Sequence, residues 1–591
     1  MNKSNFKLGL GSSLLITSQL FLAGCGSDSD SSTAEATMVL KNGAVYTMDG
    51  ADNIVSAVAI AGDHIIYVGD DTGVAQYVGK DTEVIDLDGK MVTPGFVDGH
   101  SHPPEAELNE FLYLTLGNVE PTVASYQQAL REYRAANPDL SVIWATDMQL
   151  NAFVGGAPHH SVIDEIVSDI PVIMADTSFH GQLLNSKALE LSGITAATEN
   201  PAGGQVVKDE NGEPTGYLSD APQLVSSDIP RAEVTPELFF EAYKLFEQDS
   251  ASKGITATQG FYVAPATGMP MPYEILHDYA TSGDMVGRIS WQYMFTAEAG
   301  VTASDAVQVL DNGQQFTSDW QRVNGVKTLV DGVPEGVTSF LLEPYAATAG
   351  VAADYTGEPL WNLAEYQAFV AGVDAAGYQV QTHAMGDASA RMVIDAVENA
   401  YEQNGQRDAR HVLVHANLVT PSDITRMGQL DIYAAMQPIW FYADPVFAAL
   451  ELQMLGQERF DLEYSVKDMV EAGVIISGSA DTPVTPDNRP LAGIETGVTQ
   501  GAPYPGLQGN PLYVRDEAQQ LSVLDMLRIY TINGAKQLFL DDIVGSIEIS
   551  KKADLVIIAE DITKIDPLDI SETEIVNTIV NGKIVYSNTD L

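Results

Sequence analysis

Residues 92–104, VTPGFVDGHSHPP, predict a buried strand that ends in two histidines. An apolar run leads into His100 and His102, and two prolines then stop the element. Alternate residues of a β-strand point to the same face, so the two imidazoles can face one point. Neutral imidazoles at the end of a buried strand suit a divalent metal, and we expect these two to form half of a site. The HxH pattern alone is not specific, so the other half must come from elsewhere in the chain.

The first 24 residues predict a signal peptide. Two lysines precede an apolar run over residues 8–23, which ends beside Cys25, the one cysteine of the chain. A cysteine after small residues at this place resembles a bacterial lipobox, and the resemblance implies cleavage before Cys25 and lipid attachment to it. The alternative is a plain secretory signal with an incidental cysteine. Residues 25–37 predict a flexible tether, so we expect an exported lipoprotein that is attached to a bacterial membrane through its N-terminal lipid only.

The chain is strongly acidic, with 29 Lys and Arg against 81 Asp and Glu and a net charge of −52. Such a surface repels nucleic acid and disfavours polyanionic substrates. No second stretch approaches the length of a transmembrane helix, so we expect a soluble body. One cysteine permits no disulfide within the chain, and the fold must depend on its core and on any metal.

Both ends of the mature chain predict β-structure. Residues 38–91 alternate β-branched runs with turns, and residues 543–591 contain similar runs. The hairpin signals are Asn42-Gly43, Gly62-Asp63, Asp88-Gly89 and Asn581-Gly582. We expect the two ends to pair into one β-sandwich domain.

The middle of the chain, residues 92–542, predicts an α/β barrel. After the strand that holds His100, seven further apolar runs follow at residues 254–260, 288–295, 325–331, 378–384, 411–416, 432–437 and 474–479. Helical patterns such as 363–376, 388–404, 421–430 and 461–472 separate several of them, which is typical of a (β/α)₈ barrel. Residues 105–253 are too long for one crossover, so we expect an inserted subdomain. An insertion after the first strand emerges at the catalytic face, where it can build the substrate pocket.

Four polar residues lie at the ends of later predicted strands: Lys327, His383, His415 and Asp481. Barrel enzymes place their chemistry at this rim. Taken singly, each histidine is explained by a hydrogen bond in the core and Asp481 by a turn. Their joint position on one rim with the HxH pair favours a metal site.

The order HxH, Lys, His, His, Asp on strands 1, 4, 5, 6 and 8 resembles the amidohydrolase superfamily. The phrases VTPGFVDGHSHP, HGQLLNSKAL, GGQVVKDENGEPTGYL, VKTLVDGVPEG, THAMGD, LVHAN, MQP, GSAD and VGSIEISKKADLVII resemble amidohydrolase family 3, the branch that includes N-substituted formamide deformylase. The resemblance implies a metal-dependent distorted (β/α)₈ TIM barrel with a composite β-sandwich from both termini.

The same resemblance implies the ligands. One ion would lie on His100, His102 and Asp481, and a second on His383 and His415. Lys327 would be N6-carboxylated and would bridge the ions, since a carbamate is an anionic ligand and an ammonium is not. The alternative for Lys327 is an uncarboxylated lysine paired with a carboxylate such as Asp331.

Zinc is the metal we expect, as one or two ions, because imidazole and carboxylate suit it. The resemblance implies Asp481 as the general base for a metal-activated water. His180, in the insertion, matches a family position at the pocket and would stabilise the oxyanion or serve a structural role. His159, His160 and His277 have no supporting context, and we expect them at the surface. Residues 142–150 lack the glycine-rich pattern of the family, so details of the pocket do not transfer.

We therefore expect a hydrolase of a non-peptide C–N bond, amide-like or formamide-like, in a small molecule. The same site could hydrolyse or isomerise a lactone, an ester or a ring, because the superfamily does not fix the bond. A different class is a non-catalytic surface protein with a binding or regulatory role, which would not need the full ligand set. A homodimer is left open.

Overall fold

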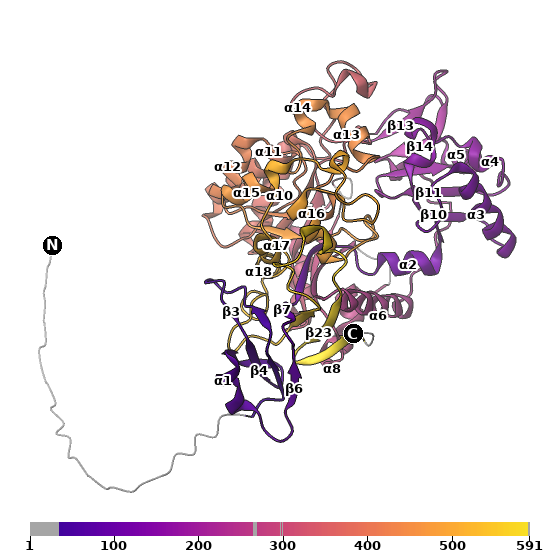
Figure 1. Ribbon diagram of the computed structural model, residues 1–591. Coiled ribbons are helices and arrows are strands. Elements are labelled where there is room, and N and C mark those ends of the chain that lie inside the picture. The colour runs from indigo at the N-terminus through magenta and orange to yellow at the C-terminus, as the bar shows by residue number, and fades with distance from the viewer. Residues whose placement is uncertain (1–34, 202, 264–268, 296, 298–299, 589–591) are drawn as a thin grey trace, which may run out of the picture.

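The computed structural model describes residues 35–588, apart from 202, 264–268, 296 and 298–299. The predicted signal peptide, Cys25 and most of the tether lie outside these residues. Figure 1 shows three parts: a β-sandwich at the bottom, a central barrel, and an inserted subdomain to the right. Among the described helices, none is both long and apolar enough to cross a bilayer.

The β-sandwich contains both ends of the described chain, as the sequence predicts. One sheet has the order β5-β4-β1-β6 and the other β24-β23-β22-β7-β2-β3. Leu40, Val92 and Leu555 belong to the apolar core of this domain. The strands are β1 (Met38–Lys41), β2 (Ala44–Tyr46), β3 (Ile54–Val55), β4 (Ala57–Ala61), β5 (His64–Gly69), β6 (Glu83–Asp86), β7 (Met91–Pro94), β22 (Leu555–Ile558), β23 (Ile575–Val580) and β24 (Lys583–Ser587).

Two of the four predicted hairpins form. Gly62-Asp63 joins β4 to β5 and Asn581-Gly582 joins β23 to β24, both antiparallel pairs. The other two predictions are wrong, because Asn42-Gly43 and Asp88-Gly89 connect strands of different sheets. Asn42 and Asp88 do have left-handed backbones, with φ of 59° and 49°. Such residues allow the chain to turn, but they do not choose the strand with which the next one pairs.

The central barrel has eight parallel strands in the order β21-β20-β19-β18-β17-β16-β15-β8, which confirms the predicted fold. Each of the eight predicted runs overlaps one of them, although β15 extends beyond its predicted end and β17 begins before its predicted start. The strands are β8 (Phe96–Ser101), β15 (Ile255–Val263), β16 (Arg288–Met294), β17 (Gln321–Leu329), β18 (Gln379–Ala384), β19 (Val412–His415), β20 (Tyr433–Met436) and β21 (Ile476–Gly478).

Helices surround the barrel strands. The longer ones are α6 (Pro236–Ser252), α9 (Ala303–Gly313), α10 (Leu363–Ala375), α11 (Asp387–Asn404), α12 (Pro421–Gln429), α13 (Phe447–Leu455) and α16 (Pro490–Thr499), and shorter ones are α15 (Val466–Glu471), α17 (Val523–Ile529) and α18 (Ile532–Gln537). The helix predicted at residues 461–472 begins later, at Val466. Tyr464 has a left-handed φ of 55°, which ends any helix that approaches from the N-terminal side.

The barrel closes between its first and last strands without a regular ladder. At the rim, the Asp481 amide donates to the His100 carbonyl (3.2 Å), and the His102 amide donates to the Thr482 carbonyl (2.9 Å). Below the rim the strands approach closely, since a Cβ on Gly99 would lie 2.5 Å from the Ser477 hydroxyl. The first strand therefore needs glycine between its aspartate and its first histidine.

The inserted subdomain is a six-stranded sheet between β8 and β15, in the order β13-β14-β12-β11-β10-β9. Its strands are β9 (Leu114–Thr115), β10 (Ile143–Met148), β11 (Val172–Asp176), β12 (Gly181–Leu184), β13 (Gln205–Lys208) and β14 (Pro214–Ser219), with helices α2 (Glu105–Leu112), α3 (Val123–Ala136), α4 (Ser161–Asp164) and α5 (Ser186–Ser192). The segment ends in α6, whose Phe239, Tyr243 and Phe246 pack in the core of the barrel. A parallel strand needs such a crossover helix, so α6 belongs to the barrel.

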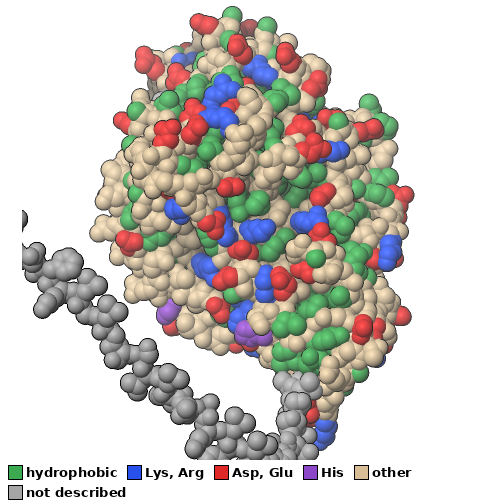
Figure 2. All heavy atoms as spheres, turned by 90° about the vertical axis from the view of Figure 1, so that its left-hand side faces the viewer, with side chains coloured by type: hydrophobic (Ala, Val, Ile, Leu, Met, Phe, Trp, Pro, Cys, Tyr) green, Lys and Arg blue, Asp and Glu red, His purple; other side chains and the backbone are tan. Residues whose placement is uncertain are grey.

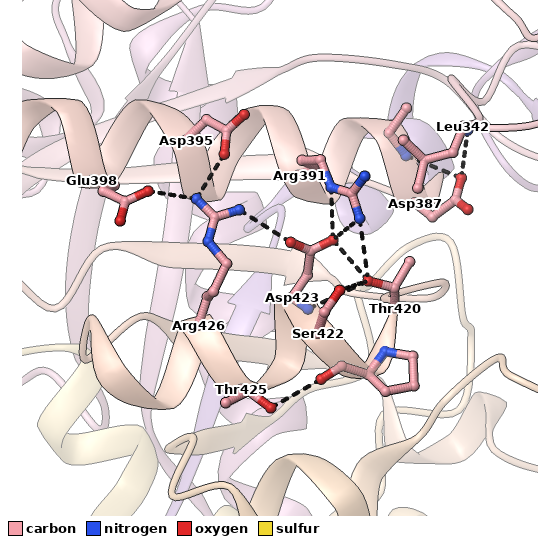
Figure 3. Close-up of polar contacts among 12 residues, drawn as sticks. Leu342, Asp387, Arg391, Asp395, Glu398, Thr420, Ser422, Asp423, Thr425 and Arg426 are labelled. Atoms are coloured by element: carbon pink, nitrogen blue, oxygen red, sulfur yellow. Dashed lines mark hydrogen bonds and ion pairs between the residues drawn. The ribbon is translucent and has the colours of Figure 1, made fainter.

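Two helices outside the barrel are joined by ion pairs (Figure 3). Arg426 on α12 pairs with Asp395 and Glu398 on α11 at 2.7 and 2.6 Å. Arg391 on α11 reaches back to Asp423 on α12 at 2.8 Å. Acidic and basic side chains also alternate over the face shown in Figure 2. Although the chain carries a large excess of acidic residues, its basic residues still form ion pairs that join neighbouring helices.

Arg288 on β16 connects the barrel to the sandwich. Its Nε and Nη2 donate to the carboxylate of Asp554, at 2.7 and 3.0 Å, and Asp554 lies just before β22. Both side chains are buried, with 0% and 1% exposure. Removing one partner of a buried pair leaves an uncompensated charge.

We expect Arg288→Ala to lower the free energy of unfolding by about 3–5 kcal/mol, because Asp554 would remain buried without its partner. Urea unfolding followed by fluorescence measures the change. The control is Arg134→Ala, whose ion pair with Asp169 is exposed and should contribute less than about 1 kcal/mol. Equal losses in the two variants would show that the buried pair does not hold the domains together.

Candidate metal centre

The end of β8 directs two histidines toward one carboxylate. His100 Nε2 lies 3.0 Å and His102 Nε2 3.3 Å from Asp481 Oδ1. His100 and Asp481 are buried, while His102 is partly exposed. The predicted first ligand set therefore converges on one carboxylate oxygen.

His415, at the end of β19, completes the most compact group. His100, His415 and Asp481 each offer one ligand atom, and these atoms lie within 4.8 Å of one another. His415 and Asp481 both have left-handed backbones, with φ of 71° and 59°. Non-glycine residues in this region cost energy and are concentrated at functional sites.

The donor atoms of this group fit a cation. Asp481 Oδ1 and His100 Nδ1 are buried, and neither makes a hydrogen bond of normal geometry with a described residue. Buried polar atoms are costly without a partner. A divalent cation would satisfy converging imidazole and carboxylate atoms, so these residues fit the metal that the sequence predicts.

His383 on β18 lies next to this group rather than within it. Its ring centroid is 4.6 Å from that of His415, and its Nε2 lies 3.2 Å from the Gly332 carbonyl. The His415 Nδ1 is 2.9 Å from the Gln437 side-chain oxygen. With those nitrogens engaged, His383 Nδ1 and His415 Nε2 are the atoms left to bind a second ion.

Lys327 lies beside the histidines, and it makes no ion pair with a carboxylate among the described residues. Its Nζ is 3.3 Å from His100 Nε2 and 4.7 Å from the centroid of the Phe261 ring. Burial lowers the pKa of Lys327 to about 7. Asp331, the alternative partner, instead accepts the Met385 amide at 3.1 Å and other backbone amides. The alternative of a Lys327–Asp331 ion pair is therefore wrong.

Burial sets the protonation of the ligand side chains. It lowers the pKa of His100 and His383 well below the usual value, and that of His415 to about 4. Burial raises the pKa of Asp481, but the nearby imidazoles of His100 and His102 hold it well below its usual value. The three imidazoles are then neutral and the carboxylate ionised near pH 7, the forms that bind metals.

His180 brings the insertion to the metal centre. It lies between β11 and β12, and its ring centroid is 5.2 Å from that of His383. Its Nδ1 lies 2.5 Å from Asp220 Oδ1, and Asp220 also accepts the hydroxyl of Thr338. Burial lowers the pKa of His180, but the charge of Asp220 and its hydrogen bond raise it to about 9.

A cavity of about 800 Å³ lies over the predicted ligands. The insertion contributes Asn151, Phe179 and His180 to its lining, and the barrel loops contribute Trp440 and Tyr464 among others. The insertion therefore forms part of the pocket wall, as its place after β8 predicts. His159, His160 and His277 are not part of this lining.

The sequence profile of the Amidohydrolase family matches residues 83–586. The chain belongs to the amidohydrolase family. This amidohydrolase is 29% identical to Protein LONG AFTER FAR-RED 3 of Arabidopsis thaliana, over 93% of the chain and 92% of that protein. It is 27% identical to the N-substituted formamide deformylase of Arthrobacter pascens, over 93% of the chain and 98% of that protein.

Solved structures show the same fold. A metal-dependent hydrolase from Pyrococcus horikoshii aligns with a TM-score of 0.65 and 21% identity, over 90% of this amidohydrolase and 99% of that chain. An atrazine chlorohydrolase from Arthrobacter aurescens, complexed with zinc, aligns with a TM-score of 0.52 and 13% identity. The alignment covers 93% of this amidohydrolase and 95% of that chain.

Three residues of the site were not predicted. Gln437 orients His415, Trp440 stacks on the same ring with 5.6 Å between centroids, and Asp220 orients His180. Gln437 lies in the MQP phrase that carries the family resemblance, and Asp220 follows the GEPTGYL phrase closely. The phrases mark the positions, but the partners lie 22 and 40 residues away in the chain.

We expect His415→Ala to reduce bound zinc to below roughly a tenth of an equivalent after gel filtration, because the compact group loses one of its donors. Elemental analysis of the zinc-loaded protein measures this. His159→Ala, which changes a histidine outside the cavity, should keep the wild-type content. Full zinc content in His415→Ala would contradict the assignment.

Proposed function

We propose that this amidohydrolase hydrolyses a non-peptide C–N bond, amide-like or formamide-like, in a small molecule. The observation that carries the proposal is the convergence of His100, His415 and Asp481 beneath a cavity. The name of the deformylase relative supports the choice of bond. The cavity volume of about 800 Å³ supports a small molecule as substrate.

The residues that would hold the metal are His100, His102 and Asp481, with His383 and His415 beside them. Zinc is proposed because the donors are imidazole and carboxylate. When bound, it supplies a Lewis acid that acidifies water and polarises a carbonyl. Lys327 is close enough to His100 to join this set, and N6-carboxylation would give it an anionic oxygen to offer.

Asp481 is the proposed general base. Its carboxylate is ionised and faces the cavity floor, so one of its oxygens can take the proton of the attacking water. The same carboxyl group then returns that proton to the leaving nitrogen, which departs as an amine. Its contact with both histidines of β8 holds it in place for both transfers.

His180 is the proposed donor to the oxyanion. Asp220 accepts a hydrogen bond from the Nδ1–H of His180. The pKa of His180, about 9, keeps its ring doubly protonated near pH 7. The Nε2–H is then available on a ring that lines the cavity. Donors aimed at developing negative charge are among the largest contributions to such catalysis.

An activity screen tests the reaction class. We expect zinc- or manganese-loaded protein to release amine from one or more N-formyl or N-acyl amines, measured by a primary-amine reagent. Carbamates, lactones and esters are included as competing substrates. Turnover confined to lactones or esters would show that the protein cuts a C–O bond and not the proposed C–N bond. A metal-loaded protein that cleaves none of these compounds would contradict the proposal.

We expect Asp481→Asn to lower kcat per bound zinc by at least about 100-fold, because an amide cannot accept the proton of water. Zinc content is measured on the same preparation, since Asp481 is also a proposed ligand. Near-normal turnover per zinc would remove Asp481 from the role of base.

We expect His180→Asn to lower kcat by about 100-fold while zinc content stays at the wild-type value, because only the oxyanion donor is lost. The matched control is His160→Asn, which changes another insertion histidine paired with an aspartate, Asp164, at 2.7 Å. His160 is not part of the cavity lining. An equal effect in both variants would indicate that His180 acts only through the stability of the insertion.

A further inference from the structure

The described lining of the cavity is rich in carboxylates and poor in cations. Apart from the histidines of the metal centre, its basic side chains are Lys327, Arg515 and His180, and the charge of His180 is paired with Asp220. Arg515 donates to both Glu451 and Glu463, each at 2.8 Å, so its single charge is shared by two carboxylates. The guanidinium is therefore not available to a substrate anion.

Most acidic side chains of the lining already have partners. Asp220 binds His180, and Asp176 accepts the hydroxyls of Tyr217 and Ser178. Asp444 accepts the hydroxyl of Tyr442 at 2.7 Å together with backbone amides. These groups are explained by contacts within the protein.

Glu335 is an acidic residue of the lining that has no such partner among the described residues. It lines the cavity from the loop after β17, between the buried Val333 and Val337. Its carboxylate makes no ion pair and no hydrogen bond to another residue of the described chain. Burial raises its pKa to about 7, and the charges of Glu451 and Asp176 add to this effect, while the charge of His180, which does not contact it, lowers the pKa.

The backbone that follows Glu335 is held to the insertion by two hydrogen bonds. The Gly336 carbonyl accepts the Ser219 hydroxyl at 3.3 Å, and the Val337 carbonyl accepts the Gln205 side chain at 3.2 Å. Both donors belong to the sheet of the insertion. An unpaired carboxylate on a backbone that is held in place beside a substrate cavity is a partly preorganised acceptor.

Aromatic rings line the cavity as well. Trp440, Tyr442, Phe447 and Tyr464 are among its lining residues. Tyr464 already attracts one cation, since the Arg515 guanidinium lies 4.8 Å from its ring centroid. Aromatic faces stabilise ammonium groups and also pack against apolar groups.

We propose that Glu335 binds an ammonium group of the substrate. The substrate class is then an N-formyl or N-acyl compound with an apolar body and a second, cationic nitrogen away from the bond that is cut. A substrate with a carboxylate in that place would meet like charge and is disfavoured. This inference rests on the proposed function for the bond that is cut, but the recognition of the cation can be measured without turnover.

The binding experiment uses 4-phenylbutylamine and 4-phenylbutanol, which share one body and differ in the charged end. Calorimetry is done with the zinc-loaded full-length protein in detergent at pH 8.5, where an alkylamine with a pKa of about 10.4 stays protonated. We expect the amine to bind at least about tenfold more tightly than the alcohol, as a charge-assisted hydrogen bond would give. Equal affinities in the wild type would overturn the proposal.

The decisive variant is Glu335→Gln, which keeps the shape of the side chain and removes its charge. We expect the preference for the amine to fall to within about twofold, with unchanged zinc content and no loss of thermal stability. Glu343→Gln is the control, since Glu343 is exposed on the same loop and outside the cavity lining. If Glu335→Gln keeps the full preference, the amine binds elsewhere, for example at the metal, and the proposal is wrong.

A turnover experiment separates this inference from the proposed function. N-formyl amines with a distal ammonium or a distal hydroxyl are compared in both proteins. We expect Glu335→Gln to raise KM for the ammonium substrate by about tenfold and to change KM for the hydroxyl substrate by less than about twofold. If neither substrate is cleaved, the proposed bond is wrong while the calorimetry still decides the role of Glu335.

Discussion

The closure of the barrel between β8 and β21 is the constraint on which the site depends. Two backbone hydrogen bonds at the rim join His100 to Asp481 and His102 to Thr482. They bring together the first and last strands of the barrel, which lie almost 400 residues apart in the chain. The close approach at Gly99 allows this closure, because a Cβ there would lie 2.5 Å from the Ser477 hydroxyl on the last strand. The ligand group is thus a consequence of how the sheet closes.

Burial then determines the protonation states of the histidines and of Asp481. In a low-dielectric interior imidazoles lose their protons, while a carboxylate keeps its charge only with partners nearby. The histidines are neutral and Asp481 is ionised for this reason, and the left-handed backbones of His415 and Asp481 add a further energetic cost. A bound cation offsets these costs, because it satisfies the donors that no described residue satisfies.

The barrel, its strand ends and the residues that meet at its rim could be predicted from the sequence because the signals are local. A strand that ends in HSH, or a single histidine after an apolar run, is visible within a few residues. The partners of those residues were not visible, since Gln437 and Asp220 meet their histidines only after the chain has folded. The two missed sheet connections at Asn42 and Asp88 have the same cause: a turn signal describes the local backbone, and pairing is decided by distant strands. Glu335 lies within the phrase VKTLVDGVPEG, but an unpaired carboxylate can be recognised only when every neighbour is known.

The loop after β17 links the chemistry to the choice of substrate. Its Gly332 carbonyl contacts His383, its Thr338 hydroxyl contacts Asp220, and Glu335 lies between them in sequence. Because Asp220 also orients His180, the insertion, the proposed oxyanion donor and the proposed cation site are parts of one connected structure. The rim ligands come from strands that every barrel of this kind must keep in register, whereas the loop and the insertion can vary without opening the barrel. Substrate preference in such a protein can therefore change through residues such as Glu335 while the metal centre stays the same.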